Sequence, residues 1–194
     1  MHGALNLHGP NNPATIAGGV FDADDVLPGV SPMVAGTGIT TGTGTVYRNL
    51  VYRIGDSIKT EIFVDLTGLH SATTDLDILG AVGAANCHLG RITLAQNGLI
   101  YKGTMSCAEA PATGVTDIDL YSATEATGTE DAAVSGLVET AIVTAGGAWT
   151  AGVQKNFTGA VVSDQYLYLT AGAAGTVGTY TAGQFVIELW GWVV

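Results

Sequence analysis

Polar and apolar residues alternate along residues 58–66. The even positions hold apolar residues or Thr, and the odd positions are polar except Phe63. This period of two predicts a strand with one face buried. Residues 45–54 alternate in the same way, and the short Gly55-Asp56-Ser57 sequence between the two segments predicts a hairpin loop.

Further short strand-like segments follow, separated by glycine-rich turns. They cover residues 74–79, 89–95, 99–105, 115–121, 138–144, 166–170 and 183–193. Asn97-Gly98 is a strong turn dipeptide, so we expect the strands on either side of it to form a second hairpin. Residues 122–136 are acidic and rich in small residues, which indicates a long loop. Roughly nine short strands without an amphipathic helix predict an all-β domain, a β-sandwich or jelly roll.

The last predicted strand is apolar on both faces. Phe185 and Leu189 fall on one face, and Trp190 and Trp192 fall on the other. Such a strand is either central and covered by two layers, or it presents its outer face to another subunit. In the second case Trp190 and Trp192 are candidate residues of a subunit interface.

Residues 1–44 differ from the rest of the chain. Four of the five prolines lie here, and the segment ends in a run of Gly and Thr. These Pro and Gly residues interrupt both helical and strand periodicity. We therefore expect an extended N-terminal arm before a sandwich domain at 45–194. A solvated tail is one alternative, but scattered apolar residues favour an arm that lies on a neighbouring subunit. Phe21, Val26 and Leu27 are its candidate contacts.

The net charge of the chain limits the classes of partner that it can bind. Lys and Arg number only 6 against 17 Asp and Glu, which gives a net charge of −11. Binding to nucleic acid and to anionic membranes depends on basic residues, so we expect neither partner. No secretory signal or membrane-spanning segment is recognisable, which favours a protein made and kept in a cytoplasm.

The two cysteines do not form a disulfide framework. We expect Cys87 and Cys107 to be buried thiols, with a bridge between neighbouring strands as the second alternative. His88 follows Cys87, but one Cys-His pair lacks the four-ligand spacing of a zinc site.

Candidate catalytic residues are few. No Gly-x-Ser-x-Gly elbow and no phosphate-binding loop is present, and we expect His70 and His88 to be exposed or hydrogen-bonded near turns. We therefore expect no enzymatic activity and no cofactor.

Two aspartate pairs recur in similar sequences, Asp75/Asp77 and Asp117/Asp119. They could bind Ca²⁺ if loops supplied further oxygen atoms. We favour the simpler interpretation, a solvated strand face. The tryptophans Trp149, Trp190 and Trp192 could form a platform for sugars, but packing in a core or an interface is the commoner role.

Residues 50–194 resemble virion structural proteins of tailed bacteriophages, especially small β-rich proteins of marine phages. The sequences that carry the resemblance are residues 50–56 and 114–121, and a tail formed by 166–172, 178–183 and 188–189. The resemblance lies in these short sequence strings and in the composition, and it includes no diagnostic motif.

The resemblance implies a head decoration (cement) protein, commonly a trimeric β-sandwich or jelly roll on the outside of the capsid. Its partners would be the major capsid protein and further copies of itself, and it would be made in the host cytoplasm and end in the virion. The family has no catalytic residues to carry over. The alternatives are a tail or fibre component that binds the host surface, a carbohydrate-binding module and a small hydrolase.

Overall fold

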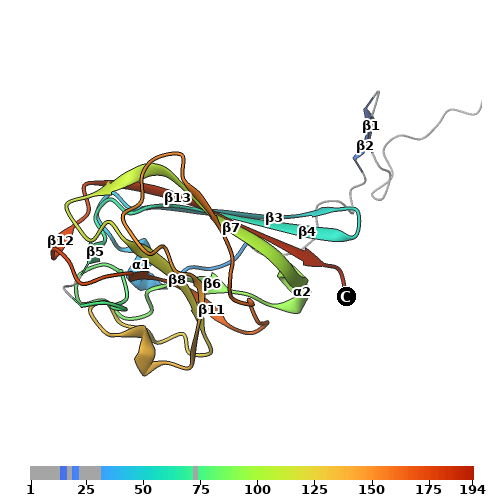
Figure 1. Cartoon of the computed structure of the whole chain (residues 1–194). Helices are drawn as coiled ribbons and strands as arrows, with labels where there is room; N and C mark the ends of the chain where they lie inside the picture. The colour runs from blue at the N-terminus through green and yellow to red at the C-terminus, as the bar shows by residue number, and fades with distance from the viewer. Residues whose placement is uncertain (1–13, 17–18, 22–31, 72–73) are drawn as a thin grey trace, which may run out of the picture.

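The computed structural model describes residues 14–16, 19–21, 32–71 and 74–194. Its main body consists of two antiparallel sheets, one above the other in Figure 1. The five-stranded sheet has the order β10-β7-β13-β4-β3. Its strands are β3 (Val46–Ile54), β4 (Ser57–Asp65), β7 (Leu99–Ala112), β10 (Gln154–Asn156) and β13 (Ala182–Trp192).

The second sheet has four strands in the order β6-β11-β8-β9. They are β6 (His88–Arg91), β8 (Ile118–Ala123), β9 (Glu139–Val143) and β11 (Tyr166–Ala171). Two short ladders pair β1 (Ala14–Ile16) with β2 (Gly19–Phe21), and β5 (His70–Ser71) with β12 (Gly178–Thr179). The helices are single turns: α1 (Thr37–Thr40), α2 (Leu94–Asn97) and the 3₁₀ helix η2 (Val134–Gly136).

The inner faces of the two sheets share one hydrophobic core. Strand β13 alternates between buried and half-buried residues, and its buried residues Phe185, Ile187 and Leu189 pack with β8 and β11 side chains such as Leu120 and Leu169. Burying each such side chain contributes about 1.5–3 kcal/mol, so this layer holds the sheets together. The expectation of an all-β fold is confirmed.

The outer faces of the two sheets differ. Tyr121 and Tyr168 on the outer face of the four-stranded sheet pack against Ile78, Cys87 and Val134 from covering loops, in a second apolar cluster. The four-stranded sheet is therefore covered on both sides. The outer face of the five-stranded sheet has no such cover among the described residues, and it is where the candidate site lies.

The hairpin predicted around residues 55–57 is confirmed, because β3 and β4 pair in register from Val46 with Asp65 to Ile54 with Ser57. Residues 32–44, which the sequence assigned to the arm, pack on the domain. Met33 and Ile39 are buried in the main core, and Met33 exchanges two hydrogen bonds with Asn49 of β3, at 2.8 and 2.6 Å. The sandwich domain therefore includes residues before position 45.

The hairpin predicted at Asn97-Gly98 is wrong. The strands on either side, β6 and β7, lie in different sheets, and α2 occupies the end of the first segment. The Thr93 hydroxyl caps α2 by accepting from the Gln96 N–H, and buried Asn97 donates to the Thr60 hydroxyl at 2.9 Å. Side-chain hydrogen bonds thus hold the Asn-Gly dipeptide at the end of a helical turn.

The strand predicted at residues 74–79 is also wrong. Leu76 has a φ of 69°, and only isolated bridges form nearby, from Asp77 to Ala133 and from Ile78 to Thr170. A left-handed residue breaks the extended backbone that a ladder requires. None of the helices in the described part of the chain has the length and apolarity needed to cross a membrane.

Candidate functional site

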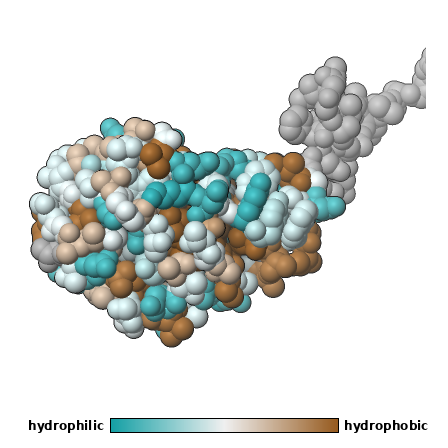
Figure 2. All heavy atoms as spheres, viewed as in Figure 1, coloured by the Kyte–Doolittle hydropathy of each residue, from teal (hydrophilic) through white to brown (hydrophobic). Residues whose placement is uncertain are grey.

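The uncovered face of the five-stranded sheet ends in a row of apolar side chains. Ile54, Trp192 and Leu99 occupy one register row across the sheet, with Ser57 between the first two. Together with Tyr101 these apolar residues are 43–53 % exposed. We call Ile54, Leu99, Tyr101 and Trp192 the apolar row. In Figure 2 hydrophobic residues gather at this end of the body, near the C-terminus.

A bulge and a glycine position the apolar row. The register of β13 on β7 shifts between Trp190 and Gly191, which leaves Tyr101 free to stack on Trp192 with ring centroids 4.7 Å apart. Gly98 has a φ of 70°, and a Cβ there would lie 2.4 Å from the Trp192 carbonyl oxygen. Only glycine allows the corner between α2 and β7 to approach β13 so closely.

Cations and aromatic rings alternate in the neighbouring rows of the same face. Lys59 and Lys102 lie over the Trp190 ring, at 5.3 and 4.8 Å from its centroid, and Arg48 lies 4.8 Å over Phe63. Three of the six basic residues of the chain therefore lie on this face, each against an aromatic ring.

Lys59 also binds two carboxylates. Its ammonium lies 2.6 Å from a Glu61 oxygen and pairs with Glu188 on the next strand. Burial lowers the pKa of Lys59, but the hydrogen bonds that Lys59 donates to both glutamates outweigh this effect and raise the pKa above its ordinary value. The hydrogen bond from Lys59 holds the pKa of Glu188 below its ordinary value. This face is therefore locally balanced in charge, unlike the acidic chain as a whole.

A groove of about 400 Å³ runs beside Trp190. Trp190 and Phe157 supply aromatic surface, and Thr104, Gln154 and Glu188 supply polar groups. Aromatic surface next to amide and carboxylate groups is compatible with the binding of a sugar.

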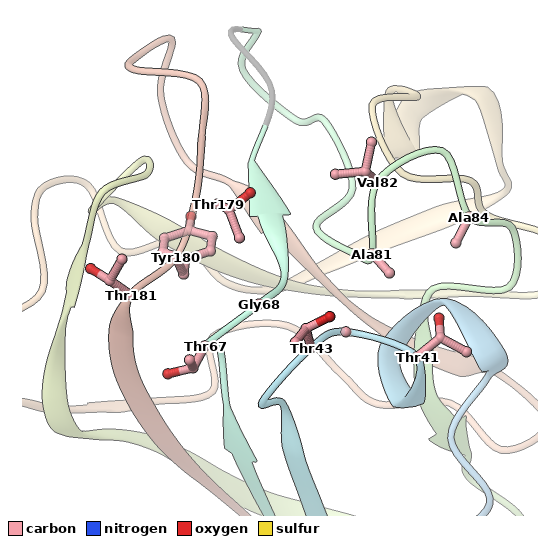
Figure 3. Close-up of a pocket in the computed structure, with 11 residues that line it drawn as sticks. Thr41, Thr43, Thr67, Gly68, Ala81, Val82, Ala84, Thr179, Tyr180 and Thr181 are labelled. Atoms are coloured by element: carbon pink, nitrogen blue, oxygen red, sulfur yellow. The ribbon is translucent and has the colours of Figure 1, made fainter.

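A larger cleft, of about 730 Å³, lies at the other end of the main body. Figure 3 shows its lining, with threonine side chains from the turn after α1, from the loop after β4, and from β12 and the segment after it. The Tyr180 hydroxyl donates to the Val115 carbonyl at 2.7 Å, and burial raises the pKa of this phenol. Among the described residues, the lining contains hydroxyl groups and no carboxylate, imidazole or thiol.

The two histidines of the body have different surroundings. His70 Nδ1 lies 2.7 Å from a Glu130 carboxylate oxygen. His88 is buried against Tyr166, with ring centroids 4.7 Å apart, and its Nδ1 has no hydrogen-bond partner among the described residues. Burial lowers the pKa of His88, so this ring is neutral at pH 7. The expectation that both would be exposed or hydrogen-bonded is met at His70 and wrong at His88.

Cys87 and Cys107 are buried free thiols, as expected. They belong to different apolar clusters. Burial raises the pKa of Cys87 to about 11 and also raises that of Cys107, which suits packing groups more than nucleophiles. Among the described residues, no three His, Cys, Asp or Glu side chains group so that they could hold a metal ion.

The expectation of a solvated aspartate face is wrong at three of the four positions. Asp77, Asp117 and Asp119 are buried, and only Asp75 is exposed. Loops cover the outer face of the four-stranded sheet, which alternation within one strand does not reveal.

The predicted interface residues are distributed as follows. Trp192 is exposed in the apolar row, and Trp190 is half-buried under its two lysines. Phe21 is the last residue of β2, and Val26 and Leu27 lie outside the described residues. Trp149 packs edge-on against Phe185 in the core and donates to the Ile118 carbonyl, so it belongs to no sugar platform. The sequence did not single out Ile54, Leu99 and Tyr101, because alternation within a strand does not tell which face of a sheet other segments cover.

No protein-family model, curated protein or solved structure matches this chain.

Proposed function

We propose that this protein is a head decoration (cement) protein of a tailed bacteriophage, bound to the outer surface of the major capsid protein lattice. The observation that carries the proposal is the apolar row on a sheet face that no described residue covers. A contiguous apolar patch of this kind marks a site of association. The resemblance of residues 50–194 to phage virion proteins supplies the type of partner.

The composition of the face suits protein–protein association. Interface cores are enriched in aromatic residues and in Arg, and they are depleted of unpaired charge. Trp190, Trp192 and Tyr101 supply the aromatic surface, and Lys59 satisfies the carboxylates of its neighbours. A cement protein needs a rigid platform, and a strand paired on both sides, such as β13, provides one.

The role needs binding and no chemistry. Contacts to several capsid subunits would stabilise the assembled shell by mass action, since the protein binds the shell and not its free subunits. A homotrimer is the assembly that we propose on the capsid, with part of the Trp190/Trp192 face in contact between copies. The proposed location is the exterior of the virion.

The first test is the copy number of this protein relative to the major capsid protein, by quantitative mass spectrometry of purified virions. A ratio near one, or a simple fraction of it, supports a lattice decoration. A few copies per particle would instead indicate a tail or vertex component, and absence from virions would refute the proposal.

The second test measures the binding of purified protein to capsids that lack it. Leu99→Lys and Trp192→Ala should each reduce occupancy several-fold, because they remove apolar area from the proposed contact. Val82→Lys is the matched control, since Val82 is 71 % exposed in a loop away from the sheet. Equal loss in all three variants would refute the assignment of this face.

A second candidate function is binding to glycans of a host surface. The observation that favours it is the groove at Trp190 with its polar neighbours, beside the exposed Tyr101–Trp192 stack. Titration with a glycan panel, read by tryptophan fluorescence, separates the two candidates. Saturable binding that Gln154→Ala abolishes and Val82→Lys preserves would favour the glycan role.

A further inference from the structure

Two buried aspartates meet on the outer face of the four-stranded sheet. Asp117 precedes β8 and Asp119 lies within it, opposite Thr170 of β11 in the ladder. The chain then turns at Gly172, whose N–H donates to the Asp117 carbonyl at 2.8 Å. Four positions from two neighbouring strands thus surround one place at the end of the sheet.

Both carboxylates face the same small space. A Cβ built at Gly172 would lie 2.7 Å from Asp117 Oδ1 and 2.8 Å from Asp119 Oδ1. Any residue with a side chain at position 172 would therefore occupy the space between the two carboxylates. Two carboxylates held so close in a buried place repel each other unless a positive charge or a proton lies between them.

The hydrogen bonding around this space is incomplete. Asp117 is 9 % exposed, and its Oδ1 is a buried oxygen without a hydrogen-bond partner among the described residues. The Thr170 hydroxyl is fully buried and also has no hydrogen-bond partner among the described residues. Asp119 Oδ1 accepts the Ala145 N–H at 2.6 Å. Buried polar atoms without a partner are costly, so two of them beside paired carboxylates point to a missing ligand.

The nearby charges leave the space negative. Asp117 and Asp75 place further negative charge around Asp119. Lys155 is the opposing cation, but its ammonium donates to the Ala145 carbonyl and not to either carboxylate. Neither carboxylate therefore has an ion-pair partner within the described residues.

We propose that this space is a calcium site, in which Asp117, Asp119 and the Thr170 hydroxyl supply oxygen ligands to one Ca²⁺ ion. Water molecules complete the shell. The donors are all oxygen, which excludes the softer metals that prefer His and Cys. Calcium tolerates an irregular shell of six to eight oxygens, whereas magnesium demands a regular octahedron. With only two buried carboxylates the affinity falls in the range of extracellular modules, a Kd of about 10⁻⁴–10⁻³ M.

The test compares thermal unfolding of the chelator-treated full chain with and without millimolar calcium. The expected result is a rise in Tm of several degrees with calcium and a smaller rise with magnesium, because a ligand that binds only the folded state stabilises it. Asp117→Asn and Asp119→Asn should each abolish the calcium-dependent rise. Asp56→Asn, whose side chain is 91 % exposed in the first hairpin, should retain it.

A second readout keeps the test decisive if the variants fail to fold. Terbium bound in this space would be sensitised by Tyr121, which follows Asp119 by two residues on the same face of β8. One equivalent of terbium luminescence that calcium displaces from the wild-type chain supports the site. The proposal is overturned if calcium leaves the Tm of the wild type unchanged and the Asp119→Asn variant is more stable than the wild type. That result would show that Asp117 and Asp119 share a proton instead of binding a cation. A calcium response that survives both substitutions would place the ion elsewhere and also overturn it.

Discussion

The sulfur of Cys87 fills the space beside Gly80, so that a Cβ on residue 80 would lie 2.3 Å from Sγ. The contact fixes the loop that covers the four-stranded sheet. Gly80→Ala should therefore destabilise the protein by about 1–3 kcal/mol, the usual cost of overpacking. Chemical denaturation measures the change.

A double-mutant cycle with Cys87→Ala tests the cause of that loss. Removing the sulfur should recover part of it, with a coupling energy of about 0.5–3 kcal/mol. Gly136→Ala is the control, because a Cβ at Gly136 meets nothing within 4 Å. Strictly additive effects of Gly80→Ala and Cys87→Ala would contradict the proposed clash.

Lys59→Met should destabilise the fold at neutral pH by about 1–2 kcal/mol, since it leaves Glu61 and Glu188 opposite each other without a cation. Lys59 lowers the pKa of Glu188, so its contribution is present above the unfolded pKa of about 4.3 and is lost as the pH falls through the folded value. The difference between wild type and Lys59→Met should therefore narrow below about pH 4.

Urea denaturation at neutral and acidic pH measures this difference. Arg53→Met is a suitable control, because the Arg53 pair with Asp56 spans 3.8 Å and is exposed. A gap between wild type and Lys59→Met that stays constant with pH would refute the role of the ion pair.

His88 should make stability depend on pH in a higher range. Burial lowers the pKa of His88 in the folded chain. Below about pH 6.5 the imidazole is therefore protonated more readily in the unfolded chain than in the folded chain. The contribution of His88 to stability is complete above the unfolded pKa and is lost as the pH falls toward the folded value. His88→Gln should flatten this part of the profile, and denaturation at a series of pH values checks it. Identical slopes in the two proteins would contradict the prediction.

The three tryptophans should respond differently to a water-soluble quencher. Trp149 is 2 % exposed and Trp192 is 47 % exposed. In variants that retain a single tryptophan, iodide should quench Trp192 several-fold more strongly than Trp149. Docking on the proposed partner should then protect Trp192 and leave Trp149 unchanged. Equal quenching of the two before docking would refute the arrangement of the row.

The sequence predicted the fold best for strands whose buried and exposed faces follow from their own residue pattern. Residues 58–66 alternate in polarity and residues 183–193 are apolar on both faces, and strands of the five-stranded sheet form at both places, with one face in the core. The two-sided apolar character of the last strand also led to Trp192, which is exposed as an interface residue would be. In these places the pattern and the packing depend on the same residues.

The failures arise where distant segments decide the outcome. Asn97 was expected in a turn, but its hydrogen bond to Thr60 of β4 holds it at the end of α2. Asp117 and Asp119 alternate as a solvated face would, but loops from elsewhere in the chain bury them. Thr93, which caps α2, is a local signal for the helical turn, whereas Thr60 and the loops that bury the aspartates lie far away in the sequence.

The free edge of β3 restricts the symmetry that an assembly of this protein can adopt. Strand β3 pairs only with β4 among the described residues, whereas the opposite edge of the same sheet is the short strand β10. If the β3 edges of two copies paired with each other, the two copies would be related by a two-fold axis. This contact would occupy the long edge of both sheets, so the assembly would end at a dimer. A closed ring of three copies needs a head-to-tail contact between two different surfaces. Pairing of β3 with β3 therefore cannot close a trimer of this protein.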